Sequence, residues 1–192
     1  GLMHYTIDAL TRLGKKIPVF CIPAGHGIGI AASILAHASP VSASFCIAKG
    51  FRRKLDLLKV SQNGTLLAHC SLLLAWGIVA TVEFETAGMR WMGPIRYRLG
   101  AIAAITNPPL FHLKISYVAA SDQTMTFCTG EGCRRCEEGT LLSQQNTNTV
   151  EDEWEVEEGY FIMASVMNLS DSTQNHRIAP YAHASDGCVD LV

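Results

Sequence analysis

The sequence predicts a mixed fold in which a short α/β part gives way near residue 40 to a longer, antiparallel β-rich part. Three observations support this prediction. Apolar residues near the N-terminus recur at helical spacing, a strand–turn–helix pattern follows over residues 17–38, and strand-like runs separated by turn residues dominate from residue 44 onward. The 192 residues suffice for one domain or parts of two, and a hydrophobic content of 48% supports a sizeable core.

The α/β part begins with a predicted helix over residues 1–13, whose buried face carries Met3, Ile7, Leu10 and Leu13. Gly14 ends this helix. Residues 17–22 form an apolar run suited to a buried strand, residues 23–27 (P-A-G-H-G) form a tight turn, and residues 29–38 are small and helical in pattern. This arrangement directs backbone N–H groups at a phosphate, although a plain connecting turn has the same pattern.

The β-rich part is predicted from four strand-like runs, over residues 44–48, 54–61, 65–74 and 76–85. Gln62-Asn63-Gly64, between the second and third runs, is a strong hairpin turn. A helix is expected within residues 86–105, and Asn107-Pro108-Pro109 closes it because proline cannot continue a helix. Strands over residues 110–120 and 159–169 and a partial strand near the C-terminus complete this part.

Residues 121–158 differ in composition from the rest of the chain. Gly, Gln, Asn and Thr cluster here, and an acidic run extends from Glu151 to Glu158. Because such a segment buries little apolar surface, we predict a long loop or disordered insertion over about 121–158. A docking role for the acidic run is the alternative to a solvated loop.

Composition also restricts the class of protein. The net charge of −2 gives no argument for nucleic acid as a partner. The longest apolar run, residues 72–82, is far shorter than the roughly 20 residues of a membrane-spanning helix. No signal-peptide pattern is present, and seven cysteines, an odd number, are typical of reduced thiols, so we expect a cytoplasmic protein.

Three of these cysteines, Cys128, Cys133 and Cys136, are close together, and the last two have C-x-x-C spacing. Zinc requires a fourth ligand, and neither a second C-x-x-C nor a pair of histidines lies nearby in the sequence. We therefore predict no metal site, and a mobile loop is the expected structure. Asn168-Leu169-Ser170 matches an N-glycosylation pattern that a cytoplasmic protein would not use.

The stretch from Ala75 to Gly100 carries the clearest chemical signal. An apolar run leads to the acidic residue Glu83, and Arg90 and Arg96 follow in a segment punctuated by glycine. One acid followed closely by two arginines suits a ligand with a cationic part and a phosphate-bearing part, because Arg holds phosphate bidentately. A strand followed by a solvated, ion-paired helix is the structural alternative.

The same stretch resembles the sphingosine kinases, the sphingoid branch of the diacylglycerol-kinase-like lipid kinases. The resemblance lies in A-W-G-I-V-A-T-V-E-F-E over residues 75–85 and M-R-W-M-G-P-I-R-Y-R-L-G over residues 89–100. Residues 1–33 are similar to the segment between that family's G-D-G-L-M-H-E motif and its P-A-G-S-G-N turn. Residues 184–192, A-S-D-G-C-V-D-L-V, resemble a later strand entry of the same domain.

The resemblance implies a two-part organisation. Residues 1–40 would be the C-terminal part of an α/β nucleotide-binding (kinase catalytic) domain, and residues 41–192 a lipid-substrate domain of antiparallel β-sandwich type. Gly1 would be the last glycine of the G-D-G motif. The catalytic aspartate would then lie just before Gly1, so no catalytic residue is expected within the chain. The final strands of the β domain would lie beyond its end.

The resemblance also implies site residues and ligands. Contacts with the nucleotide fall on Gly1, Gly25, His26, Arg90 and Arg96, the two arginines facing the phosphates. Glu83 would receive the ammonium of a sphingoid base, where the family commonly has Asp. ATP and Mg²⁺ are the implied cofactors, and a sphingoid substrate implies transient, peripheral contact with a membrane surface. The oligomeric state is left open.

Departures from the family pattern keep a second hypothesis open. Tyr5 replaces a glutamate, and His26 and Ile28 replace the usual Ser or Thr and Asn of the nucleotide turn. The first hypothesis is a lipid kinase that phosphorylates sphingosine or a related base, as a truncated form. The alternative is a catalytically inactive homologue that binds lipid or a partner. NAD kinase activity is disfavoured because the residue 75–100 motifs are those of the sphingoid branch.

Overall fold

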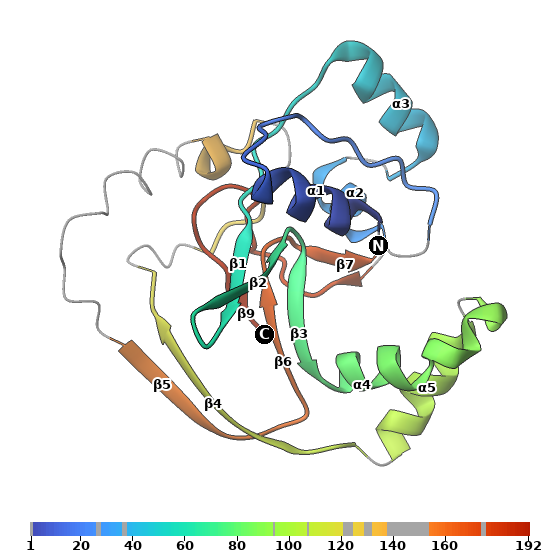
Figure 1. Ribbon diagram of the computed structural model, residues 1–192, viewed down its shortest axis with the longest axis vertical. Helices are drawn as coiled ribbons and strands as arrows, with labels where there is room; N and C mark the ends of the chain where they lie inside the picture. The colour runs from blue at the N-terminus through green and yellow to red at the C-terminus, as the bar shows by residue number, and fades with distance from the viewer. Residues whose placement is uncertain are drawn as a thin grey trace. The chain divides into compact units, whose positions relative to one another are not determined.

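The computed structural model describes residues 2–25, 28–35, 38–93, 95–106, 108–120, 125–128, 132–137, 154–173 and 176–192. The chain divides into two compact units. The first contains Gly1–Leu73, Thr124–Asn148 and Met167–Asp190, and the second contains Leu74–Gln123, Thr149–Val166 and Leu191–Val192. Helices and several antiparallel strand pairs are both present, which confirms the predicted mixture of α/β and β structure (Figure 1).

The first unit begins with the predicted helix, α1 (Leu2–Arg12). Ile7 is buried on its inner face, and Gly14 ends the helical path with a φ of 64°. The helix packs on strand β2 (Thr65–Cys70). The Asp8 carboxylate accepts hydrogen bonds at 2.9 Å from both the backbone N–H and Nδ1 of His69, and it forms an ion pair with Arg12 at 2.8 Å.

The strand predicted over residues 17–22 is wrong. This segment has no regular secondary structure, and Ile17 is 59% exposed. An apolar run becomes a buried strand only when neighbouring strands pair with its backbone, and none of the described strands does so. The helix predicted over residues 29–38 is confirmed in part as α2 (Gly29–Ile34). His26 and Gly27 of the predicted turn lie outside the described residues.

Helix α2 lies very close to strand β7 (Asp171–Thr173), which pairs with β8 (His176–Arg177). A Cβ atom at Gly29 would collide with the backbone oxygens of Asp171 and Ser172, so only glycine permits this approach. The Ser33 hydroxyl accepts a hydrogen bond from the Asp171 backbone N–H at 2.9 Å. These contacts place α2 on the C-terminal part of the same unit.

The strand predicted over residues 44–48 is also wrong, because this run lies inside helix α3 (Pro40–Lys49). Its ends carry strong helix signals. The Ser39 hydroxyl accepts a hydrogen bond from the Ser42 N–H at 3.1 Å, Pro40 starts the helix, and Gly50 ends it in the left-handed conformation, with a φ of 68°. Capping therefore outweighs the strand-like composition of the run.

The predicted hairpin is confirmed. Strands β1 (Leu58–Gln62) and β2 (Thr65–Cys70) pair antiparallel, with Gln62 opposite Thr65. Asn63 and Gly64 both have positive φ values, 50° and 76°, which is the backbone of a type I′ turn. The strand begins later than predicted, since residues 54–57 have no regular secondary structure.

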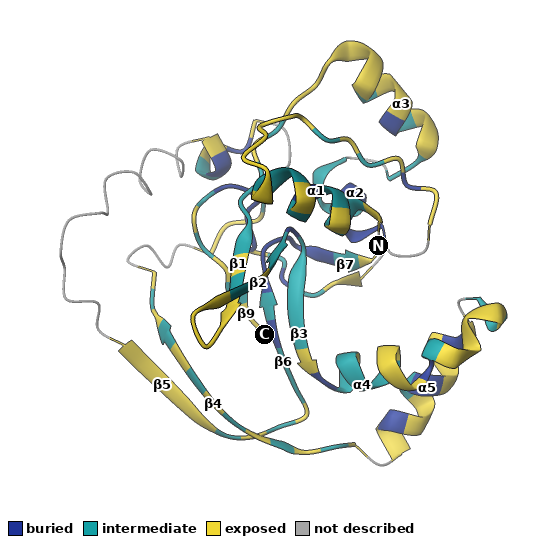
Figure 2. Ribbon diagram, in the orientation of Figure 1, coloured by how far each residue is buried: buried dark blue, intermediate teal, exposed yellow. Residues whose placement is uncertain are grey.

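Two clusters of buried side chains form the core of the first unit. One contains Cys133, Cys136, Leu169 and Ala184, and the other contains Met167, Ala179 and Ala182. Asn168 lies between Met167 and Leu169 and is itself buried, so the N-glycosylation pattern is inaccessible. Figure 2 shows this concentration of buried residues around β7 and the segment that follows it.

The second unit contains most of a three-stranded sheet with the order β3–β6–β9, formed by Leu73–Gly77, Met163–Met167 and Asp190–Leu191. The last element agrees with the predicted partial strand near the C-terminus. The strand predicted over residues 76–85 is wrong beyond Gly77, because helix α4 (Ile78–Glu85) follows. Gly77 turns the chain with a φ of 81°, and the Ile78 N–H then donates to the Ile162 carbonyl at 3.0 Å.

Helical structure continues with the 3-10 helix η1 (Ala87–Met92) and helix α5 (Ile95–Thr106), which ends before Pro108 as predicted. Helices α4 and α5 pack against each other closely at Gly100, where a Cβ atom would lie 2.7 Å from Thr86 Cγ2. No helix in the described part of the chain is both long enough and apolar enough to cross a lipid bilayer.

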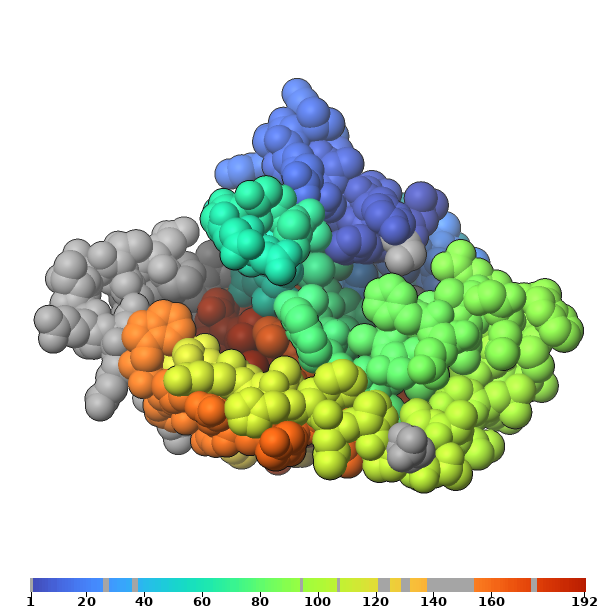
Figure 3. Space-filling model, turned by 60° about the horizontal axis from the view of Figure 1, so that its bottom comes forward, coloured from blue at the N-terminus to red at the C-terminus, as the bar shows by residue number. Residues whose placement is uncertain are grey.

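Strands β4 (Phe111–Val118) and β5 (Trp154–Phe161) form a long antiparallel ribbon, with Phe111 opposite Phe161 and Val118 opposite Trp154. Figure 3 shows the two strands side by side in yellow and orange. β4 confirms the strand predicted over residues 110–120. The insertion predicted over about 121–158 is wrong at its end, because its last five residues belong to β5 and pair fully with β4.

Gly77→Ala tests the junction between β3 and α4. The new Cβ would collide with the Ile162 carbonyl oxygen, and the φ of 81° is strained for alanine. We expect the free energy of unfolding in urea to fall by at least about 2 kcal/mol. Gly88→Ala is the control, because a Cβ at Gly88 meets nothing within 4 Å. Equal stability of the two variants would contradict the junction described here.

Candidate functional site

Glu83 and Arg96, two of the residues predicted to contact ligands, lie together in the second unit. Glu83 belongs to α4 and Arg96 to α5, and the Arg96 Nη2 atom lies 3.0 Å from the Glu83 Oε1 atom. Arg96 is buried, whereas the Glu83 side chain is 52% exposed. The carboxylate therefore has one oxygen on an internal cation and retains a face toward solvent.

The Arg96 guanidinium has further partners within the same helical pair. Nη1 donates to the Thr86 carbonyl at 3.1 Å and to the Thr86 hydroxyl at 3.0 Å, and Nη2 also contacts the Tyr97 hydroxyl. The hydrogen bond that Arg96 donates to the Glu83 carboxylate raises the pKa of Arg96 above its ordinary value, and an arginine side chain is a permanent cation in any case. Burial, followed by a hydrogen bond with Glu83, raises the pKa of Tyr97. Arg96 thus joins the end of α4 to the start of α5.

The other residues predicted to contact ligands lie on other segments of the chain or outside the described residues. Arg90 lies on η1 and is exposed. Gly25 is exposed in the first unit, and Gly1 and His26 lie outside the described residues. Ile28, which occupies the position where the family usually has Asn, is only 7% exposed and belongs to the core. The structure brings together Glu83 and Arg96 alone among the described members of the predicted set.

The surface around this pair is unusually apolar. Trp91 on η1 is 84% exposed, and other large apolar side chains on α4, η1 and α5 are exposed as well: Val79, Phe84, Ile95, Ile102 and Ile105. The atoms of these helices are green in Figure 3. A hollow of about 380 Å³ lies between α4 and the end of α5, lined by Thr81, Glu85, Ala103, Ala104, Pro108 and Pro109. Exposed apolar surface of this kind marks a contact with a lipid, a membrane or a protein.

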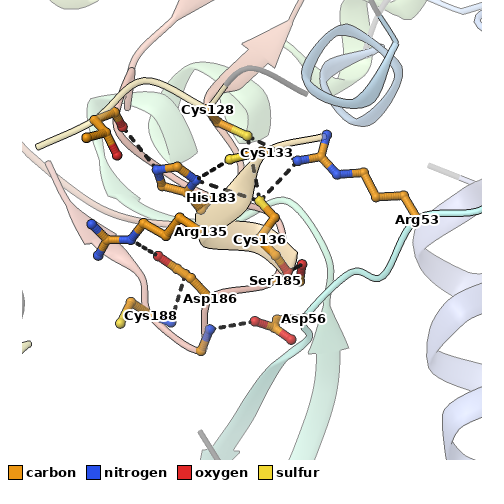
Figure 4. Close-up of polar contacts among 12 residues, drawn as sticks. Arg53, Asp56, Cys128, Cys133, Arg135, Cys136, His183, Ser185, Asp186 and Cys188 are labelled. Carbon is orange, nitrogen blue, oxygen red and sulfur yellow. Dashed lines mark hydrogen bonds and ion pairs between the residues drawn. The ribbon is translucent and has the colours of Figure 1, made fainter. Parts of the chain in front are cut away.

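A second constellation lies in the first unit and was not predicted as a site. The sulfurs of Cys128, Cys133 and Cys136 and the imidazole of His183 converge (Figure 4), and their candidate ligand atoms all lie within 4.8 Å of one another. Cys133 and Cys136 are each only 5% exposed, which contradicts the mobile loop expected for them. A short helical turn over residues 134–137 carries Cys136.

The contacts around these four side chains are specific. Cys133 Sγ lies 3.3 Å from His183 Nδ1, and Cys136 Sγ lies 3.7 Å from the same atom. Arg53 Nη2 lies 3.1 Å from both the Cys128 and the Cys136 sulfurs. The hydrogen bond with Cys128 and burial raise the pKa of the Cys136 thiol, and the nearby Arg53 lowers it in part.

His183, the fourth side chain of this group, is far from the three cysteines in sequence. His183 is 47 residues from Cys136 in sequence, and only the return of the chain through residues 178–186 brings the two together. The Arg135–Asp186 ion pair at 3.0 Å and the hydrogen bond from the Ser185 hydroxyl to the Cys136 carbonyl at 2.8 Å hold this return in place. The sequence indicated only the three cysteines, through their close spacing, and gave no sign of the histidine.

Comparison with known proteins agrees with the motifs of residues 75–100. No protein-family model matches the chain. Sphingosine kinase 1 of Arabidopsis thaliana is 31% identical over 186 residues, which cover 92% of this chain and 38% of that protein. Sphingosine kinase 2 of the same plant is 27% identical over 94% of this chain and 39% of its own length. Ceramide kinase of Mus musculus is 22% identical over 89% of this chain and 35% of its own length.

These relatives are sphingosine and ceramide kinases, a class of lipid kinases. They support, as the motifs predicted, a sphingosine kinase-like lipid kinase family for this chain. The chain spans about two fifths of the length of the plant relatives it matches.

Arg96→Lys tests whether this arginine organises the helical pair. Lysine cannot reproduce the forked contacts with Thr86 and Glu83, so we expect a lower urea midpoint of unfolding. Arg98→Lys, on an exposed position of the same helix, should leave the midpoint unchanged. If both variants are as stable as the original chain, the guanidinium does not contribute to the packing of α4 and α5.

Proposed function

We propose that this chain forms part of a kinase that transfers the γ-phosphate of ATP to the primary hydroxyl of sphingosine or a related sphingoid base. The observation that supports this most strongly is similarity to sphingosine kinases over nine tenths of the chain, combined with the acid and two arginines of residues 83–96. In the reaction, the hydroxyl oxygen bonds to the γ-phosphorus, the bond to the ADP oxygen breaks, and the hydroxyl proton passes to a base. We assign no base within the chain.

The domain assignment is part of the same proposal. Residues 1–40 contribute to an α/β nucleotide-binding domain, and residues 41–192 form the lipid-substrate domain. Gly1, Gly25 and His26 contact ATP from the first segment. Bound Mg²⁺ would neutralise the charge that develops on the phosphates, which phosphoryl transfer requires, and we assign no residue of the chain to hold it.

Glu83 is the proposed partner of the sphingoid ammonium. Arg96 already binds one carboxylate oxygen and Tyr97 also hydrogen-bonds the carboxylate, but the half-exposed side chain keeps lone pairs that a second cation can reach. A second cation on the same carboxylate is repelled by Arg96, which opposes binding. The hydrogen-bonded arginine also fixes the carboxylate in one orientation, which reduces the entropy lost when the lipid binds.

We propose different roles for Arg90 and Arg96. Arg90 is exposed on η1 and is accessible to ATP phosphates. Arg96 uses both terminal nitrogens on protein groups, which favours a positioning role for it beside any contact with phosphate. The exposed apolar side chains of α4, η1 and α5 suit the hydrocarbon chain of a lipid and transient contact with a membrane surface. A cytoplasmic, peripheral location follows from this proposal.

The burial of Ile28 favours a second candidate function. In the family this position usually carries Asn in the nucleotide turn, whereas here the side chain is part of the core. A homologue that binds lipid or a partner without turnover accounts for this change and for Tyr5 and His26. In that case the working part is the second unit, which carries Glu83 and the apolar surface.

Glu83→Gln tests the ammonium contact directly. Because glutamine keeps the shape of the side chain but removes the charge, we expect sphingosine affinity to fall about tenfold or more. The affinity for ATP should not change. The same substitution at Glu158, a half-exposed carboxylate on β5, is the control and should have no effect on either affinity. Unchanged sphingosine binding by Glu83→Gln would remove Glu83 from the lipid site.

A turnover assay separates the two candidate functions. The natural-length protein is mixed with labelled Mg-ATP and sphingosine in detergent micelles, and labelled lipid phosphate is counted. Phosphorylation of sphingosine establishes the kinase and excludes the inactive homologue. Sphingosine binding without phosphorylation, and independent of ATP, would favour the binding module instead.

A further inference from the structure

We propose that Cys128, Cys133, Cys136 and His183 bind a structural zinc ion, in a site separate from the proposed Mg-ATP chemistry. Among the described residues, these four side chains form a compact group of metal-ligating atoms with three buried members. They come from separate parts of the chain and meet in the core of the first unit, where Cys133 and Cys136 pack with Leu169 and Ala184. Three thiolates and one imidazole are a ligand set that zinc prefers in structural sites.

Three of the six distances among the four ligand atoms are close to those of a tetrahedral zinc sphere, and all six are within 4.8 Å. With Zn–S bonds of about 2.3 Å and a Zn–N bond of about 2.05 Å, tetrahedral geometry places two sulfurs about 3.8 Å apart and a sulfur about 3.6 Å from the nitrogen. The Cys128 and Cys136 sulfurs are 3.8 Å apart. The Cys133 and Cys136 sulfurs lie 3.3 and 3.7 Å from His183 Nδ1. A disulfide would require about 2.05 Å between sulfurs.

The orientation of His183 is that of a metal ligand. Its Nε2 atom lies 3.0 Å from the Thr126 carbonyl oxygen, which can only accept a hydrogen bond, so Nε2 carries the proton. The neutral imidazole then has its lone pair on Nδ1, the atom that faces the sulfurs. A backbone carbonyl that fixes the tautomer in this way is the usual outer partner of a zinc-bound histidine.

Arg53 supplies an independent argument from charge. Its Nη2 atom contacts two of the sulfurs, and its Nη1 atom is buried without a hydrogen-bond partner among the described residues. Arg53 as a whole is only partly buried, and burying even part of a guanidinium is costly unless an anion lies beside it. Three thiolates, one Zn²⁺ and a neutral imidazole carry a net charge of −1, which Arg53 neutralises. Neutral thiols alone would leave this cation without a counter-charge.

Four protein ligands leave no open position for water or substrate, so the site serves the structure and not the reaction. The ion would join Cys128, Cys133 and Cys136 to the segment that contains His183, with Arg53 beside two of the sulfurs. This is a function of the first unit and does not depend on the proposed kinase activity.

The test begins with the metal content of the purified chain and its binding of Co²⁺. We expect one zinc per chain by elemental mass spectrometry. After chelation under reducing conditions, Co²⁺ should restore one equivalent, with the visible absorption of a tetrahedral site and thiolate-to-cobalt charge-transfer bands. Removal of zinc should lower the thermal midpoint of unfolding, and added zinc should restore it. A metal-free chain with no response to zinc or Co²⁺ would overturn the proposal, as would a Cys128–Cys136 disulfide in the native chain.

Variants assign the ligands. Cys136→Ser and His183→Gln should each weaken Co²⁺ binding by more than about 100-fold, which exceeds the roughly 10–100-fold effect of losing an outer partner. Arg53→Met removes an outer partner, so it should weaken Co²⁺ binding by only about 10–100-fold and leave the tetrahedral spectrum unchanged. Cys188→Ser, a half-buried cysteine near His183 but outside the cluster, is the matched control and should bind Co²⁺ normally. Binding that persists unchanged in both Cys136→Ser and His183→Gln would place the metal elsewhere and contradict this site.

Discussion

The buried amide of Asn168 is the interaction on which the first unit depends. Its Nδ2 atom donates to the carbonyls of Asp56 and Ser71, at 2.8 and 2.9 Å, and its backbone N–H donates to the Leu72 carbonyl at 2.9 Å. Asn168 thereby joins two points of the chain, Asp56 and the consecutive residues Ser71 and Leu72, that are about a hundred residues away in sequence. The Oδ1 atom of the same amide has no hydrogen-bond partner in the part of the chain that the structure describes. Because unpaired carbonyls are costly in a core, this arrangement fixes where residues 167–186 return, and hence where His183 meets the cysteines.

In the second unit, two glycines and one arginine position the charged residues. Gly77 ends β3 and turns the chain into α4, and Gly100 allows α5 to approach it closely. Arg96 then fills the interior of the helical pair and holds Glu83 at its surface. The sequence pattern predicted that Glu83 lies near the end of a strand. In the structure Glu83 lies on the short helix α4, among exposed apolar side chains. The same pair that stabilises the helices orients the carboxylate we assign to the lipid.

Much of this fold was predictable where the signal is local. The Asn-Gly turn of the first hairpin, the prolines after α5 and the spacing of α1 each act within a few residues, and all three predictions are confirmed. The runs over 44–48 and 78–85 were mispredicted as strands because apolar and β-branched residues suit either structure, and caps or a glycine turn decided the outcome. His183 could not be predicted, because a contact 47 residues away depends on the path of the whole unit.

The short helical turn over residues 134–137 shows why a composition-based prediction of disorder was wrong there. An isolated turn of helix is unstable in water, so its order must come from tertiary contacts. Two buried cysteines, the ion pair between Arg135 and Asp186, and the Ser185 hydrogen bond provide them. Arginine is rarely buried and counts against a core in a composition average, yet beside three cysteines and one ion it completes a compact, charge-balanced centre. A segment poor in apolar residues can thus be ordered by coordination. The partly buried Arg53, whose Nη1 atom has no hydrogen-bond partner among the described residues, supports an anionic centre there.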